Sequence, residues 1–175
     1  MLAIGDPCPP FDLPGTEGRQ HTLDDFEGKK VLVVLVSCNH CPYVVAYEPR
    51  IVAFAKEFER ASVQVVCVNA NDAVRYPDDG LEPMRLRAEE RGFTFPYLRD
   101  DSQSFVRALG AKFTPEAFVF DEARALRYHG RIDDNHRDLS KVGSHDLLQA
   151  TRALLAGKAP VPAETVAFGC SVKWK

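Results

Sequence analysis

Two segments rich in valine dominate the hydrophobic pattern of the chain: residues 30–36 (KVLVVLV) and residues 62–68 (SVQVVCV). Both are short and β-branched, and neither shows the strict alternation of a half-exposed strand, so we predict strands covered on both faces. Apolar residues between them recur at a helical spacing after Pro42, which predicts a helix joining two parallel strands. Pro49 lies inside this helix, and we expect a kink there because proline removes one backbone donor.

Turn residues and periodicity predict the remaining elements. Prolines near the N-terminus exclude an initial helix, and Gly15–Gly18 is typical of a hairpin turn. A late hairpin is expected around residues 121–124, and the tail after Pro160 is expected to be irregular. The other predicted elements are an extended piece at 95–98, strands over 116–120 and 126–132, and helices over 82–91, 102–109 and 144–155, the last two capped by Ser102 and Ser144.

This order of elements predicts an α/β fold with a mixed central sheet and helices on its faces. The two early strands should pair in parallel, whereas the late hairpin supplies antiparallel partners. A β-hairpin extension precedes this core, and a short irregular tail follows it. The length of 175 residues suits one domain with its own hydrophobic core.

Composition narrows the classes of function. The formal net charge is −3, so no basic surface indicates nucleic acid and no polybasic run indicates a membrane. The N-terminus lacks a basic and apolar leader, and no apolar run is long enough to span a bilayer. The expected location is therefore the cytoplasm, where paired cysteines are usually catalytic, redox-sensing or metal-binding. The five cysteines are an odd number, which argues against a framework of structural disulfides.

The most informative motif is residues 37–42 (SCNHCP), which follows a predicted buried strand and opens the predicted helix. A cysteine at a helix N-terminus faces unpaired N–H groups and the positive end of the helix dipole. Both favour the thiolate, which lowers the pKa and increases nucleophilicity at neutral pH. Protonation of His40 would act in the same direction. Cys38 and Cys41 are therefore the candidate catalytic residues.

The motif and its surroundings resemble the AhpC/TSA–thioredoxin-like superfamily, close to its peroxiredoxin-like and TlpA-like thiol oxidoreductases. The resemblance covers residues 4–156 and extends to the tail at 169–174 (GCSVKW). It implies a thioredoxin-like fold, one domain over residues 1–175 with a C-terminal tail at 158–175, and thiol–disulfide exchange. The segments that carry it are residues 5–7, 11–13, 22–26, 30–36, the C-x-x-C motif, residues 95–100, and Thr114-Pro115 before the strand at 116–120.

Thr114 and Pro115 form the second candidate site, for substrate binding. In thioredoxin-like proteins the proline before this strand is cis and packs opposite the cysteines, and the resemblance implies the same here. Cis X-Pro bonds make up only about 5–6% of such bonds in folded proteins, so they mark constrained turns. The resemblance also implies that the backbone of Thr114 pairs with an extended substrate segment. The alternative is an ordinary trans proline at a strand entry.

The order of attack within the cysteine pair depends on the register of the motif. Pro49 lies eight residues after Cys41, as a helix proline does after the first cysteine of TlpA-like relatives. Proline is favoured at the first helical position, so Pro42 indicates that Cys41 is the N-cap. We therefore favour Cys41 as the attacking thiolate and Cys38 as its partner. The same register weakens a peroxidase, because Cys38 stands where peroxiredoxins place a Thr or Ser.

The remaining cysteines have other roles. Cys170 is a candidate resolving cysteine, because a tail residue can reach a sulfenic acid or mixed disulfide. The alternative is a tail cysteine that only packs on the surface. Cys8 and Cys67 are expected to be structural. No second Cys/His cluster accompanies the motif, so we expect neither metal nor cofactor.

The sequence is compatible with three functions. The first is a thiol–disulfide oxidoreductase that acts on a protein or small-molecule disulfide and receives electrons from a thioredoxin or glutathione system. The second is a thiol-dependent peroxidase. The third is a redox sensor or metal-binding protein without turnover, since a fold does not fix a function. Nucleic acid and membrane partners are not expected.

Overall fold

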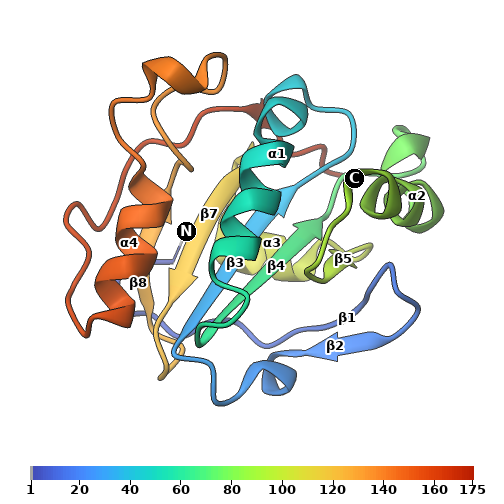
Figure 1. Cartoon of the computed structure of the whole chain (residues 1–175). Helices are drawn as coiled ribbons and strands as arrows, with labels where there is room; N and C mark the ends of the chain where they lie inside the picture. Colours follow the sequence, from blue (N-terminus) through green and yellow to red (C-terminus); the bar gives the residue numbers. More distant parts are fainter. Residues whose placement is uncertain (1) are drawn as a thin grey trace.

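The computed structural model describes residues 2–175 and is built around one five-stranded mixed sheet (Figure 1). The central strand β3 is fully buried and pairs in parallel with β4 and antiparallel with β7, which confirms the predicted mixed sheet. The strand order is β5-β4-β3-β7-β8. Their bounds are β3 (Val31–Ser37), β4 (Val63–Asn69), β5 (Tyr97–Arg99), β7 (Glu116–Phe120) and β8 (Leu126–Gly130).

Helices cover both faces of this sheet, as predicted. Figure 1 shows α1 and α4 on one face and α3 on the other. Apolar side chains of α1, α2 and α4 pack on the first face, including Tyr47, Met84 and Leu147. Leu109 of α3 packs on the second face together with N-terminal residues such as Phe11. The helices are α1 (Pro42–Glu57), α2 (Leu81–Arg91), α3 (Ser104–Leu109) and α4 (Asp146–Leu155).

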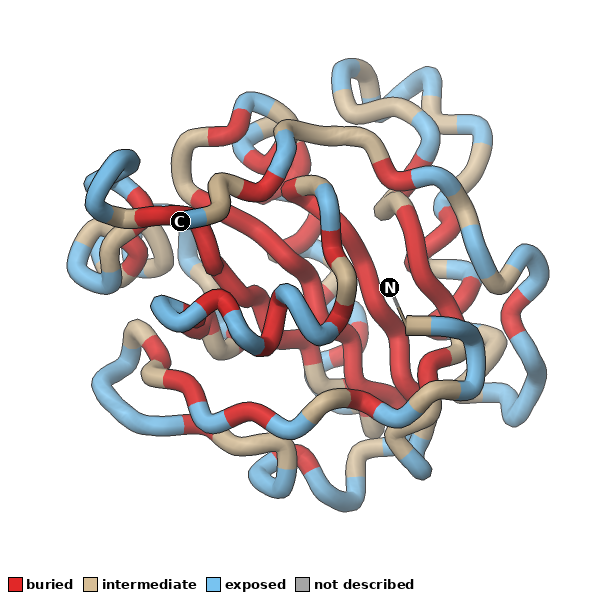
Figure 2. Tube along the Cα trace, turned by 180° about the vertical axis from the view of Figure 1, so that it is seen from behind, coloured by how far each residue is buried: buried red, intermediate tan, exposed pale blue. Residues whose placement is uncertain are grey.

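The segments outside this core match the sequence in outline. Strands β1 (Asp12–Pro14) and β2 (Gln20–Thr22) form the expected N-terminal antiparallel hairpin. Seen from behind, the sheet is almost wholly buried while the loops around it are exposed (Figure 2). No helix within residues 2–175 is both long and apolar enough to cross a membrane. Three short 3-10 helices were not predicted: η1 (Leu23–Phe26), η2 (Pro77–Asp79) and η3 (Leu139–Lys141).

Two predicted helix starts are wrong by two residues. The residue before α3 is Gln103, and the residue before α4 is His145. The hydroxyls of Ser102 and Ser144 instead donate to the carboxylates of Asp100 and Asp146. At the start of α3 the Asp100 carboxylate is the acceptor instead, because its Oδ2 accepts a hydrogen bond from the Val106 N–H at 2.9 Å. Because the two serine hydroxyls bind nearby carboxylates, neither serine caps its helix, and each helix begins two residues later than predicted.

The other differences concern the end of β8 and the tail. Pro49 lies inside α1, as predicted, and the helix runs through it over 16 residues. Strand β8 ends at Gly130, two residues earlier than predicted. The tail is largely irregular as expected, yet it also contains a strand, β9 (Cys170–Ser171), which pairs antiparallel with β6 (Phe113–Thr114). The tail thereby returns to the sheet end at which β7 begins (Figure 1).

One buried carboxylate joins two helices of the first face. Glu48 of α1 is 4% exposed, and both of its oxygens accept from Arg87 of α2 at 2.8 Å. We expect Glu48→Ala to lower the free energy of unfolding by about 3 kcal/mol, because it leaves a partly buried guanidinium without its partner. Urea denaturation measures this, with Glu90→Ala as the control, because Glu90 is exposed and lies only within 4.0 Å of the same guanidinium. An equal effect of both variants would contradict a structural role for Glu48.

Candidate active site

The cysteine motif lies where the sequence predicts, between a buried strand and a helix. Cys38 directly follows β3, and Cys41 is the N-cap of α1 with Pro42 as its first residue. Both sulfurs are covered, since Cys38 is 1% and Cys41 0% exposed. The carboxyl end of the central strand therefore presents two thiols in one enclosed position.

A buried aspartate holds the loop between the two cysteines. Asp79 of η2 is fully buried, and its Oδ1 accepts from the Asn39 backbone N–H at 2.7 Å and from the Asn69 side chain at 2.9 Å. Its Oδ2 accepts from the Asn71 side chain at 2.9 Å. The Asn39 side chain in turn accepts from the Tyr97 hydroxyl at 3.0 Å. The backbone of the motif is thus fixed by buried hydrogen bonds that the sequence analysis did not foresee.

The loop before β7 faces both sulfurs. Cys38 Sγ lies 3.4 Å from Thr114 Oγ1, and Cys41 Sγ lies 3.2 Å from the Thr114 carbonyl oxygen. The Thr114–Pro115 bond is cis, as the sequence predicts. Glu116 holds this loop, because its carboxylate accepts from the backbone N–H groups of Lys112 and Phe113. The predicted site residues Cys38, Cys41, Thr114 and Pro115 therefore come together in space.

The two thiols differ in their tendency to ionise. The pKa of Cys41 is lowered, chiefly by a hydrogen bond from Cys38, which outweighs the opposing effect of burial. Hydrogen bonds from the Cys170 thiol and from the backbone amides of Val44 and Cys170 lower this pKa further. The pKa of Cys38 is raised, because the same contact with Cys41 and its own burial oppose ionisation, and the Asp79 carboxylate adds to both. When the pair holds one proton, these opposite directions favour ionisation at Cys41 and retention of the proton at Cys38.

Cys170 completes the group of sulfurs. In the β6–β9 pairing its Cα is the direct partner of Thr114, and its side chain packs against the cluster of Cys38, Cys41 and Val44, where it contacts Cys41. Cys170 is partly exposed. Its pKa is raised to about 11, mainly by burial and to a smaller extent by its contact with Cys41. The edge of Thr114 that the family resemblance assigns to a substrate segment is thus taken by the protein's own tail. The two-residue strand has no periodicity, so the sequence could not indicate it.

Cys38, His40 and Asp79 form the one potential metal-binding group among residues 2–175. Their donor atoms lie within 4.8 Å of one another, and sulfur, nitrogen and oxygen are all ligands that zinc accepts. His40 Nδ1 lies 2.6 Å from Asp79 Oδ2, and its ring stacks on Tyr76. Asp79, however, already accepts three amide hydrogen bonds that fix the loop. We therefore assign the group to the architecture of the motif.

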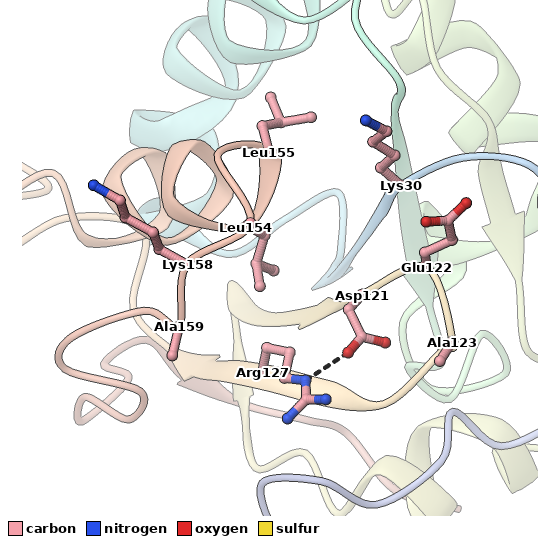
Figure 3. A pocket seen from close by; sticks show the side chains of 10 residues that line it. Lys30, Asp121, Glu122, Ala123, Arg127, Leu154, Leu155, Lys158 and Ala159 are labelled. Atoms are coloured by element: carbon pink, nitrogen blue, oxygen red, sulfur yellow. Dashed lines mark hydrogen bonds and ion pairs between the residues drawn. The ribbon is translucent and has the colours of Figure 1, made fainter.

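Two features fall outside the site. Cys8 and Cys67 are buried, and burial raises the pKa of both thiols, that of Cys8 to about 12, so both are poor nucleophiles. A hollow of about 540 Å³ lies near the start of β3, at the opposite end of that strand from Cys38. It contains no cysteine, and Arg127 and Asp121 form an ion pair inside it (Figure 3). It offers none of the chemistry of the thiol cluster.

A family model described as Redoxin matches residues 3–144, which include the cysteine motif and the Thr114 loop. The chain belongs to the Redoxin family. A hypothetical protein from Sinorhizobium meliloti 1021 has 35% sequence identity and a TM-score of 0.94, covering all of this chain and 96% of its own. The family assignment confirms the sequence-based resemblance and the thioredoxin-like fold.

Curated relatives of this Redoxin protein include enzymes of thiol chemistry. Thiol-disulfide oxidoreductase ResA from Geobacillus thermodenitrificans is 28% identical over 123 residues, which are 69% of this chain and 65% of ResA. A relative from Mycobacterium tuberculosis (strain H37Rv) whose name places it among the peroxiredoxins is 26% identical over 110 residues, 63% of this chain and 65% of that protein. The chain thus spans about two thirds of the length of these relatives.

Proposed function

We propose that this Redoxin protein is a thiol–disulfide oxidoreductase in which Cys41 attacks and Cys38 resolves. One observation carries the proposal: the covered Cys38 and Cys41 pack against one another at the N-terminus of α1. Their pKa values are shifted in opposite directions, down at Cys41 and up at Cys38, which supports the same assignment. A thiolate with a lowered pKa is both a nucleophile at neutral pH and a good leaving group. The name of the ResA relative supports the same chemistry.

The exchange reaction balances within the pair and its substrate. The Cys41 thiolate attacks one sulfur of a disulfide, a Cys41 mixed disulfide forms, and the other substrate sulfur leaves as a thiolate that takes a proton from solvent. Cys38 then attacks Cys41 Sγ, the mixed disulfide breaks, and the second substrate sulfur leaves with the Cys38 proton. The substrate disulfide is reduced to two thiols while Cys38 and Cys41 become a disulfide.

The contact between the two sulfurs also determines when Cys38 can attack the mixed disulfide. In the resting pair, the Cys41 thiolate is the largest cause of the raised pKa of Cys38. Once Cys41 is bound in a mixed disulfide, its negative charge is gone and this cause disappears. The pKa of Cys38 falls at that moment, and Cys38 becomes able to attack. The contact that keeps Cys38 protonated at rest therefore releases it only after substrate is bound.

A trapping experiment tests these roles. In a Cys170→Ser background, we expect the smaller, uncharged disulfide 2,2′-dipyridyl disulfide to release two thiolates from the Cys38–Cys41 pair and leave no adduct. Cys38→Ser in that background should release one thiolate and retain an adduct on Cys41, because the resolving thiol is absent. Absorbance of the released thiolate and intact-protein mass spectrometry measure both. An adduct on Cys38 in the matching Cys41→Ser variant, formed as fast, would contradict the assignment.

A thiol-dependent peroxidase is the second candidate. Complete burial of Cys41 favours a small oxidant over a bulky one, and one relative is named as a peroxiredoxin. Cys41 would reduce peroxide to water and become a sulfenic acid, which a neighbouring thiol converts to a disulfide with loss of a second water. The residue three positions before Cys41 is Cys38 rather than Thr or Ser, which disfavours this function. Peroxide consumption with a dithiol donor separates the two candidates.

A further inference from the structure

The C-terminal tail contributes Cys170 to a cluster of three sulfurs, which also contains Cys38 and Cys41. Strand β9 pairs with β6 in a register that sets Cys170 opposite Thr114, whose carbonyl contacts Cys41. Gly169 allows this approach, since a Cβ there would lie 2.2 Å from the Thr114 carbonyl oxygen. A glycine is therefore required at this position for the tail to reach the cysteines.

The residues after Cys170 anchor the strand on the fold. Val172 is 5% exposed within the hydrophobic core, and its N–H donates to the Lys112 carbonyl at 3.0 Å. The Lys173 backbone bonds to Asn71 and Asp72, and Trp174 packs against the Arg107 guanidinium at 4.2 Å. These contacts hold Cys170 against Cys41 in the folded state.

Access to solvent separates the three sulfurs. Cys38 and Cys41 are 1% and 0% exposed, whereas Cys170 is only partly buried. A bulky thiol therefore meets the cluster first at Cys170. A disulfide between Cys38 and Cys41 is shielded from direct attack by the same tail that carries this third cysteine.

We propose that Cys170 is a third redox residue, a relay that moves the disulfide of the buried pair to the surface for reduction by an external thiol. This role rests on the proposed function of the pair. Cys170 attacks Cys41 Sγ of the Cys38–Cys41 disulfide, the Cys41–Cys170 bond forms, and Cys38 leaves with the proton that Cys170 gave up. An external thiol then attacks Cys170 Sγ and releases the Cys41 thiolate. A second external thiol frees Cys170 and leaves as a disulfide with the first.

The pKa values of Cys41 and Cys170 favour attack by an external thiol at Cys170 Sγ. In a Cys41–Cys170 disulfide the leaving group of that step is Cys41, whose pKa is the lowered one, and exchange is faster when the leaving thiol has a low pKa. Attack at the other sulfur would expel Cys170, whose pKa is raised to about 11. Both accessibility and leaving-group strength therefore direct the external thiol to Cys170.

Re-reduction kinetics test the relay. We oxidise each variant to one disulfide, add glutathione, quench with acid and an alkylating reagent, and follow the remaining disulfide by mass spectrometry. Cys170→Ser should slow re-reduction by about tenfold or more, because it removes the relay sulfur and leaves the tail in place over the pair. Val166→Ala, on the exposed part of the same tail, should leave the rate unchanged.

The Cys170→Ser variant distinguishes a relay from a simple cover, because it keeps the tail in place and removes only the sulfur. If the tail only shielded the pair, Cys170→Ser would be re-reduced as fast as the natural chain, which would overturn the relay. Peptide mapping of oxidised Cys38→Ser supplies the structural readout, with a Cys41–Cys170 disulfide as the expected product and its absence as a contradiction.

The outcome also separates the relay from the underlying activity. If Cys170→Ser still forms a Cys38–Cys41 disulfide and is reduced as fast as the natural chain, the relay is wrong and the proposed oxidoreductase stands. If no variant forms a disulfide at Cys41, the proposed function itself fails.

Discussion

Replacing Cys41 with serine is expected to lower disulfide turnover by at least ~10³-fold, because it removes the only thiol of the cluster whose ionisation is favoured. A hydroxyl is not a nucleophile at neutral pH without a base. The charge that keeps Cys38 protonated also disappears, so Cys38 gains reactivity but remains beside Asp79 and 1% exposed. Serine has nearly the volume of cysteine, so the thermal stability should change little.

The pH dependence of thiolate absorption identifies the ionised residue without any substrate. The pKa of Cys41 is lowered, so the natural chain should retain thiolate absorption at about pH 6, where an unperturbed thiol is protonated. Cys41→Ser should lose that absorption. Cys8→Ser is the matched control, since the pKa of Cys8 is raised and its removal should change nothing at this pH. Retention of the low-pH thiolate in Cys41→Ser, with loss in Cys38→Ser, would reverse the two roles.

Asp79→Ala should have the largest effect on the architecture of the site. It leaves the Asn39 N–H and the side-chain amides of Asn69 and Asn71 without an acceptor, all in or beside a fully buried position. Buried donors without partners cost about 1–3 kcal/mol each, so we expect a loss of about 3–5 kcal/mol in the free energy of unfolding. Turnover should fall as well, because the backbone between the cysteines is no longer fixed.

Urea denaturation and the turnover assay together check this variant. Asp78→Ala is its control, since the side chain of Asp78 is exposed and only its backbone carbonyl contacts Asn39. Asp79→Asn keeps the shape and one acceptor oxygen, so it should be the milder variant. Equal stability of Asp79→Ala and Asp78→Ala would show that the loop is held by other contacts.

The strand, the helix and the cysteine pair could be predicted from the sequence because their signals are local. The valine-rich β3 has no polar face, and Pro42 marks the first turn of α1 and therefore the N-cap at Cys41. The fold around them was also predictable, since a buried strand, a helix and a second buried strand have one common arrangement. The helix starts near Ser102 and Ser144 were misplaced because nearby carboxylates accept from the two hydroxyls, and the end of β8 was placed two residues too late.

The parts of the site that were missed depend on contacts between distant residues. Asp79 lies in a polar, turn-rich segment that resembles any exposed loop, and its burial follows from Asn39, Asn69 and Asn71 closing around it. Strand β9 is two residues long and is defined by pairing with β6, more than fifty residues earlier. Neither feature leaves a period or composition that a single sequence could reveal.

Disulfide mapping in the Cys170→Ser variant tests the central claim most directly, because it isolates the buried pair from the tail. The reduced protein is equilibrated in glutathione buffers of increasing oxidation, quenched, and digested without reduction for mass spectrometry. We expect a Cys38–Cys41 disulfide that forms and disappears reversibly as the glutathione buffer is changed. A protein that stays fully reduced, or that carries only glutathione or sulfenic acid on Cys41 with Cys38 free, would contradict it.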